Sequence, residues 1–219
     1  MSKRPQDYVN LAALAINIAQ RWANNYPNYT VKFANFVDFT IEAQNFQLKV
    51  IENATHDIRK KANTLVLQAV NKEIVDSIKV LRKYIKAEYP TEKDLSAILA
   101  SFGLEKNLTG MYNLPNDNDR RQQCLNLLVT KMSEPNNFVA NKPVGLQVWQ
   151  LLRERHANAW NESKNIKSQK TSLSRETRAY ALSVDEVLRK LYAQIKIDFP
   201  KHEVAKILRE FGFLSEIYK

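Results

Sequence analysis

Glycine and cysteine are scarce in this chain of 219 residues, which has four glycines and one cysteine. Average usage would put about 15 glycines in a chain of this length. Tight β-turns and glycine-rich phosphate loops depend on that residue, so the composition argues against a turn-rich β-sandwich. The single Cys124 excludes an intrachain disulfide and a zinc site with several cysteine ligands.

Long apolar runs are missing as well. No stretch of 18 apolar residues occurs, so we expect no membrane span. The chain starts with a basic segment followed by an apolar run at 8–18, which is the order found in a signal peptide. Asn10 and Asn17 interrupt this run, and Trp22 continues its helical face. We therefore interpret the run as the first structural helix and expect a cytoplasmic protein.

Motifs that carry catalysis or bind cofactors are also lacking. The sequence contains no phosphate-binding glycine loop, no nucleophile elbow and no His-Glu-x-x-His pattern. A di-iron helical bundle needs Glu-x-x-His pairs, and none of His56, His156 and His202 has a glutamate three residues earlier. We expect no metal, no cofactor and no catalytic residues, and we lean against an enzyme.

Helical periodicity is the strongest positive signal. Apolar residues spaced three and four apart predict a first helix that ends before Pro27. Three further helices are predicted over about 30–53, 57–88 and 91–102. After a segment without periodicity, helices are predicted over about 117–132, from 144 through Trp160, over 172–198 and after Pro200. Each half of the chain thus reads as three long helices plus a short one.

The helix expected over 30–53 has an unusually broad apolar face. Val37, Ile41, Leu48 and Ile51 form one set at helical spacing. A second apolar set, which includes Phe39, Phe46 and Val50, lies beside the first. We interpret this breadth as burial between two neighbours.

The pattern of the first half recurs in the second. Pro90 and Pro200 lie 110 positions apart, and several residues before them match at that offset. After the prolines the offset becomes 109, with one residue lost in a turn. The identical pairs are Ala69/Ala179, Leu81/Leu191, Ile85/Ile195, Lys86/Lys196, Ile98/Ile207, Leu99/Leu208, Phe102/Phe211 and Gly103/Gly212.

These observations predict an all-α fold made of two tandem related helical-bundle repeats, each with three long helices plus a short C-terminal helix, arranged with pseudo-twofold symmetry. The predicted organisation is repeat 1 at 1–104, a linker at 105–118 and repeat 2 at 119–219. We expect Tyr89 and Phe199 to close the bundle ends. Gly103 and Gly212 are expected to supply the positive φ of a helix C-cap.

Positive charge is the one remaining feature that indicates a binding function, since the formal net charge is +10. A basic stripe runs along the predicted helix at 72–86, and a denser patch lies at 153–178 among Ser and Thr residues. Lys and Arg neutralise phosphates, and hydroxyls donate to them. The candidate polyanion-binding residues are Lys164, Lys167, Lys170, Arg175 and Arg178 in the patch, and Lys79, Lys83 and Lys86 in the stripe.

Two functions are consistent with the sequence. The first is a non-enzymatic helical interaction or structural module that binds a protein partner or associates with itself. The alternative is binding of nucleic acid or another polyanion through the basic patch and the basic stripe.

Overall fold

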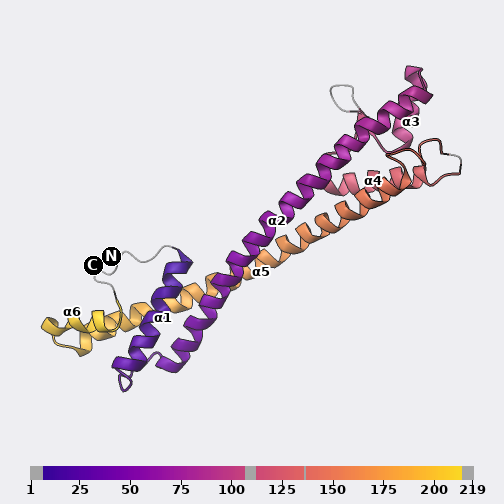
Figure 1. The fold of residues 1–219 in the computed structure, drawn as a ribbon. Helices are drawn as coiled ribbons and strands as arrows, with labels where there is room; N and C mark the ends of the chain where they lie inside the picture. Colours follow the sequence, from indigo (N-terminus) through magenta and orange to yellow (C-terminus); the bar gives the residue numbers. More distant parts are fainter. Residues whose placement is uncertain (1–6, 107–111, 136, 214–219) are drawn as a thin grey trace. The chain divides into compact units, whose positions relative to one another are not determined.

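The structure is a computed structural model and describes residues 7–106, 112–135 and 137–213. Helices dominate this part of the chain, which confirms the all-α expectation (Figure 1). Strands β1 and β2 form one short antiparallel hairpin. In chain order the elements are α1 (Tyr8–Asn25), α2 (Phe36–Glu88), α3 (Glu92–Ser101), β1 (Glu105–Lys106), β2 (Tyr112–Asn113), α4 (Asn118–Met132), α5 (Leu146–Asp198) and α6 (Lys201–Glu210).

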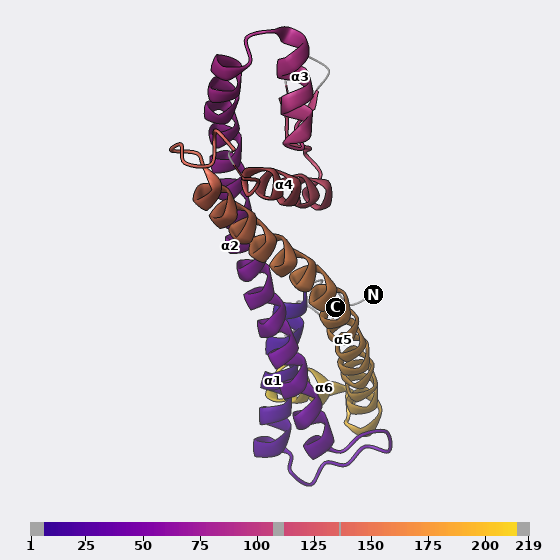
Figure 2. The same cartoon turned by 90° about the vertical axis from the view of Figure 1, so that its right-hand side faces the viewer.

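The expectation of three long helices in each half is wrong. α2 and α5 are each one continuous helix of 53 residues, as Figures 1 and 2 show. The predicted breaks near 54–57 and 161–171 rested on polar residues alone. Neither helix contains Gly or Pro, so nothing in the backbone stops it there. Residues 161–171, which lie between the helices predicted through Trp160 and over 172–198, are therefore helical.

The chain folds into two compact units. Unit 1 consists of Met1–Ile58 with Lys167–Lys219, and unit 2 consists of Arg59–Ile166. Each unit thus combines one stretch of α2 with one stretch of α5. These bounds differ from the sequence segments 1–104, 105–118 and 119–219. Of the segment expected to be a linker, residues 107–111 lie outside the described part, and the remainder carries both strands and the start of α4.

Unit 1 is built around a core of aliphatic and aromatic side chains from α1, α2, α5 and α6. Trp22 is fully buried and donates from Nε1 to the carbonyl oxygen of Tyr29 at 2.9 Å. The ring of Tyr26 stacks on Phe211 with centroids 4.5 Å apart. The carbonyls of Arg209 and Glu210 at the end of α6 accept hydrogen bonds from the side chains of Arg21 and Asn25, both at 3.0 Å. This satisfies acceptors that a helix end leaves without partners.

Unit 2 has a separate core from the second stretch of α2, α3, α4 and the first stretch of α5. Its stretches of α2 and α5 run antiparallel, because Arg59 contacts Glu162 while Glu73 contacts Arg155. Tyr89, expected to close a bundle end, packs against Phe138 with ring centroids 5.5 Å apart. Within the described ranges, no helix combines the length and apolar content that crossing a membrane requires, and the cytoplasmic location stays a prediction.

The ends of α3 and α6 share one hydrogen-bonded motif. Gly103 and Gly212 have φ angles of 76° and 93°, as expected for C-cap glycines. The following residue donates its N–H back to a carbonyl five residues earlier, from Leu104 to Leu99 at 3.2 Å and from Phe213 to Leu208 at 2.8 Å. This 6→1 bond is the mark of a Schellman motif and closes both helices in the same way.

Burial along α5 yields a test of which leucines hold unit 1 together. Leu191 is fully buried, whereas Leu182 on the same stretch of helix is 61% exposed. We expect Leu191→Ala to lower the free energy of unfolding by about 2–5 kcal/mol, through lost burial and a residual cavity. Leu182→Ala should change it by less than about 0.5 kcal/mol. Urea unfolding followed by circular dichroism measures both, and equal effects would contradict this description of the core.

Candidate functional site

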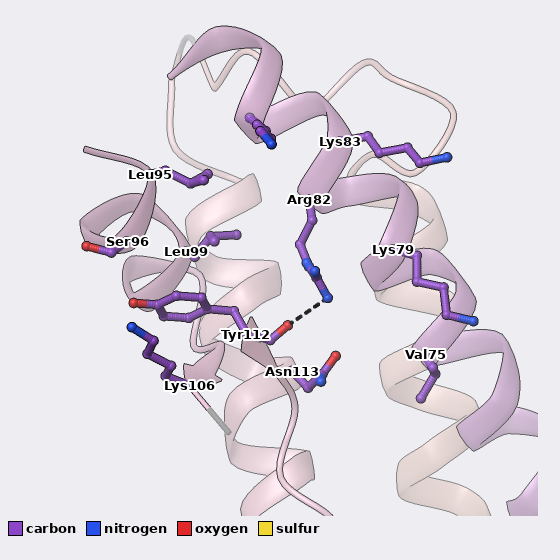
Figure 3. Close-up of a pocket in the computed structure, with 11 residues that line it drawn as sticks. Val75, Lys79, Arg82, Lys83, Leu95, Ser96, Leu99, Lys106, Tyr112 and Asn113 are labelled. Atoms are coloured by element: carbon purple, nitrogen blue, oxygen red, sulfur yellow. Dashed lines mark hydrogen bonds between the residues drawn. The ribbon is translucent and has the colours of Figure 1, made fainter. Parts of the chain in front are cut away.

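The candidate site is a groove in unit 2 that we call the basic groove. One wall is the second stretch of α2, the other is α3, and the β1–β2 hairpin closes one end (Figure 3). Its cavity measures about 790 Å³, which is within the range of ordinary ligand pockets. The lining residues are Val75, Lys79, Arg82, Lys83, Lys86, Leu95, Ser96, Leu99, Lys106, Tyr112 and Asn113.

The side chains of α2 reach this groove because of their helical spacing. Arg82 and Lys83 follow Lys79 by three and four residues, and Lys86 follows them by four and three, so the four residues share one side of α2. The core of unit 2 takes another face of the helix, through Ile78, Leu81 and Ile85. Positive charge thus gathers along the side of α2 that its own core leaves to solvent.

The groove contains five cations, and none of its lining residues is acidic. Lys79 reaches outside the lining to Asp76, with 2.7 Å between Nζ and Oδ1. This hydrogen bond lowers the pKa of Asp76. Lys83, Lys86 and Lys106 form no ion pair within the described residues. Their charges therefore stay available to an anion.

Arg82 has a distinct position among these cations. It is half-buried, and its Nη1 donates to the carbonyl oxygen of Tyr112 at 3.4 Å, so its side chain extends from α2 toward the hairpin (Figure 3). In the same view Lys79 and Lys83 extend along the outer side of α2. Arg82 thus sits at the inner end of the groove, whereas the lysines stand at its rim on flexible stems.

Apolar surface forms the rest of the groove. Leu95 and Leu99 of α3 contribute from one side and Val75 of α2 from the other. The ring of Tyr112 adds an aromatic face from β2. A ligand in this groove would meet positive charge and apolar side chains together.

The structure brings three of the eight candidate residues together in this groove, namely Lys79, Lys83 and Lys86. Sequence reasoning missed Arg82 and Lys106. The spacing of Arg82, three residues after Lys79, was a signal that could have found it. No comparable signal existed for Lys106, because it reaches the groove only through the β1–β2 hairpin.

The other five candidates lie on α5, and none of them lines the basic groove. In unit 2, Lys164 pairs with Asp119 at 3.5 Å and its Nζ lies over the ring of Trp160. In unit 1, Lys170 pairs with Asp57 at 2.9 Å. Lys167, Arg175 and Arg178 are exposed on the helix.

Further arginines near that segment are also engaged in unit 2. Arg155 makes a bidentate pair with Glu73, at 2.5 and 2.9 Å. Arg120 pairs with Glu105 at 2.7 Å, and Arg121 is buried, with its Nε donating to the carbonyl of Pro115. Among the described residues of unit 2 outside the groove, about half of the cations are thus matched by acids or buried, whereas others form no ion pair, namely Lys60, Lys61, Lys72, Lys142 and Arg153.

The described residues of unit 1 do not repeat the basic side of α2 at the corresponding positions of α5. At the offset of 110, Lys79 and Arg82 correspond to Arg189 and Tyr192. Arg189 pairs with Asp185 at 2.5 Å, and Tyr192 packs edge-on against buried Phe213, with centroids 5.6 Å apart. The corresponding position in unit 1 is therefore occupied by neutralised charge and aromatic packing.

The buried histidines and the cysteine belong to packing regions. His56 is buried, and Cys124 is buried with the pKa of its thiol raised by desolvation. His156 is fully buried, with Nδ1 2.7 Å from Oε1 of Gln122 and Nε2 3.3 Å from Oδ1 of Asn118. No group of three His, Cys, Asp or Glu side chains suited to a metal occurs among the described residues.

No protein-family model, curated protein or solved structure matches this chain.

The environment of His156 predicts a pH-dependent stability. Burial, and secondarily the charge of Arg121, lower the pKa of His156 to about 4, from about 6.5 in an unfolded chain. Between these two pH values the imidazole of His156 is therefore protonated in the unfolded state and neutral in the folded state. The resulting stability is present above pH 6.5 and is lost as the pH falls toward 4, by ~3 kcal/mol.

The matched variant is His156→Gln, which keeps a hydrogen-bonding side chain and does not titrate. We expect its free energy of unfolding to decline less steeply than that of the wild type between pH 7 and about pH 4. Urea unfolding at a series of pH values measures both curves. Parallel curves would show that His156 is not held neutral by burial.

Proposed function

We propose that this protein is a non-enzymatic helical interaction module that binds an acidic, partly apolar segment of a protein partner in the basic groove of unit 2. The single observation that carries the proposal is the gathering of five cations, with no acidic lining residue, over apolar surface. Carboxylates of the partner would meet Lys79, Arg82, Lys83, Lys86 and Lys106, and its apolar side chains would meet Leu95 and Leu99.

Two features of unit 2 favour an acidic peptide over a nucleic acid. A nucleic-acid strand needs a track of cations along its backbone and stacking surfaces for its bases. Outside the groove, Arg155, Lys164 and Arg120 are paired with acids. Within the groove Tyr112 is the one aromatic lining residue. A short amphipathic acidic segment uses both the charge and the apolar surface that are present.

We also propose that the two sequence repeats, 1–104 and 119–219, derive from one duplicated helical segment with pseudo-twofold symmetry. The bounds of α1, α2 and α3 support this, because they recur in α4, α5 and α6 at offsets of 110, 110 and 109 at their first residues. Asp7 and Asp117 cap their helices alike, each accepting from the backbone N–H three residues later at 2.8 Å.

Buried positions support the duplication further. All six residues of α4 that are buried have a buried counterpart in α1 at the offset of 110. The pairs are Leu11/Arg121, Leu14/Cys124, Ala15/Leu125, Ile18/Leu128, Ala19/Val129 and Trp22/Met132. Sequence identity is absent from these pairs, so shared burial carries the correspondence.

The groove proposal predicts a loss of affinity when its rim charges are removed. Lys83 and Lys86 are exposed, so Lys83→Gln with Lys86→Gln should leave folding unchanged. We expect about tenfold weaker binding of a fluorescent peptide of Glu and Leu residues, measured by anisotropy in about 50 mM salt. Wild-type affinity should fall as salt rises to about 200 mM, because exposed charges are screened.

The matched control removes two charges from unit 1, at the positions that correspond to Lys79 and Lys86. Arg189→Gln with Lys196→Gln removes the same charge from the chain, and we expect peptide affinity to stay within about twofold. A labelled single-stranded oligonucleotide tests the polyanion alternative in the same assay. Tighter binding of the oligonucleotide than of the peptide, or equal losses in the two double variants, would contradict the proposal.

A further inference from the structure

α2 has a second apolar stripe that the described part of the chain leaves uncovered. The breadth of its apolar face predicted burial between two neighbours. In unit 1, Phe39 and Phe46 are buried as expected, with exposed fractions of 1% or less. The other set consists of large aliphatic side chains that are between 51 and 69% exposed. These residues are Val37, Ile41, Leu48, Ile51 and Ile58.

The spacing of the exposed stripe is that of a coiled-coil seam. With Gln44 and Thr55 included, the positions from Val37 to Ile58 follow alternating steps of four and three residues. This is a heptad repeat over three heptads, which a helix presents as one continuous line about 30 Å long. We call these seven positions the exposed seam. Scattered single hydrophobic residues on a surface need no explanation, but a seam of this regularity does.

The long helix of the second half shows that the fold itself does not require this seam. At the offset of 110, α5 places mainly polar residues at the same seven positions. They are Gln147, Leu151, Glu154, Asn158, Asn161, Asn165 and Ser168. The buried face, in contrast, is kept, with Trp149 at the position of Phe39. The apolar character of the exposed seam therefore indicates a contact that α2 makes and that α5 does not make.

We propose that the exposed seam of α2 pairs with the seam of a second copy of this chain, as an antiparallel coiled coil. Six of the seven seam positions, from Ile41 to Ile58, are complementary to themselves about the midpoint between Lys49 and Val50, and Val37 meets Ala62 of the second copy just beyond the seam. In that register Ile41 meets Ile58 of the second copy, and Leu48 meets Ile51. The two polar members, Gln44 and Thr55, meet each other, so that every aliphatic layer is apolar on both sides.

Other arrangements match less well. An antiparallel register moved by one heptad sets Gln44 against Leu48 and Thr55 against Val37, which buries polar groups beside aliphatic ones. A parallel pair sets Ala54, and no acidic residue, beside Arg59 of the second copy, so the seam gains no flanking charge pair. The symmetric antiparallel register matches both the polar positions and the flanking charges.

Charges beside the seam and the area of the contact fit the same occupant. Asp38 flanks the seam opposite Arg59 of the second copy, and the symmetry repeats this pair at the other end of the contact. Within its own chain Arg59 also contacts Glu162. Three heptads from each copy bury on the order of 1,000 Å², the lower range of specific protein interfaces. We therefore expect a dimer that dissociates on dilution.

The test is the mass of the full chain in solution, measured by sedimentation velocity over a range of concentrations. The wild type should shift from a monomer of 25.4 kDa toward a dimer as concentration rises. Leu48→Asn with Ile51→Asn copies the residues of α5 at the same positions, and both side chains are exposed, so helicity should persist. We expect the dissociation constant to rise by about 100-fold or more.

Leu182→Asn is the matched control, because Leu182 is an exposed leucine of unit 1 on α5. It should leave the dissociation constant within about twofold. A monomeric wild type at about 100 μM, or a dimer that the double variant does not weaken, would overturn the proposal. The peptide assay on the basic groove is independent of this result, since Lys83→Gln with Lys86→Gln does not alter the seam.

Disulfide trapping tests the orientation. In a Cys124→Ser background, a chain carrying Ile41→Cys is mixed with a chain carrying Ile58→Cys under mild oxidation. The antiparallel register predicts a crosslink between the two variants and little crosslinking of either variant with itself. Self-crosslinking of the Ile41→Cys chain in preference to the mixed product would overturn the antiparallel pairing.

Discussion

The burial of the apolar faces of α2 and α5 is the constraint on which the rest of the structure depends. Each helix has 53 residues, and one stretch of each lies in each unit. The other helices of each half are far shorter, with 18 and 10 residues in the first half. One half of the chain therefore cannot cover its own long helix. Each compact unit instead combines a stretch of α2 with a stretch of α5 and two short helices. These are α1 and α6 in unit 1, and α3 and α4 in unit 2.

This construction leaves parts of the surface available for binding. In unit 2 Arg82 extends from α2 toward the hairpin, lysines of α2 stand at the rim of the groove, and the hairpin supplies Lys106. In unit 1 the first stretch of α2 buries one apolar set and leaves the exposed seam uncovered. The positions of unit 1 that correspond to the groove carry paired charge and aromatic packing. The positions of α5 that correspond to the exposed seam are mainly polar. If the two repeats arose by duplication, the differences between them mark where binding surfaces developed after it.

Local signals in the sequence were sufficient for several elements. Thr91 caps α3 as expected, Gly103 and Gly212 have the positive φ that ends a helix, and Pro90 follows α2. Breaks within the long helices were predicted wrongly, because polar residues such as Asp57 were read as a helix boundary. A helix tolerates polar side chains on an exposed face, and without Gly or Pro its backbone has no reason to stop.

Non-local features could not be predicted in this way. The packing of a given stretch of α2 with a given stretch of α5 depends on pairing between distant parts of the chain. The apolar periodicity of a helix is the same whichever partner it packs against. The exposure of Val37 and Ile41 follows from that pairing, as does the position of Lys106. Of the candidate site, the lysine face of α2 was visible in the sequence, whereas the opposite wall was not.

Cleavage of the full chain between the halves tests the central claim most directly. A recognition sequence for a specific protease is inserted within residues 107–111, and the cut protein is passed over a sizing column without denaturant. Because each unit contains residues from both halves, we predict that the two pieces elute together and keep the helicity of the uncut chain. Separation into two pieces that are each folded and helical would contradict the account.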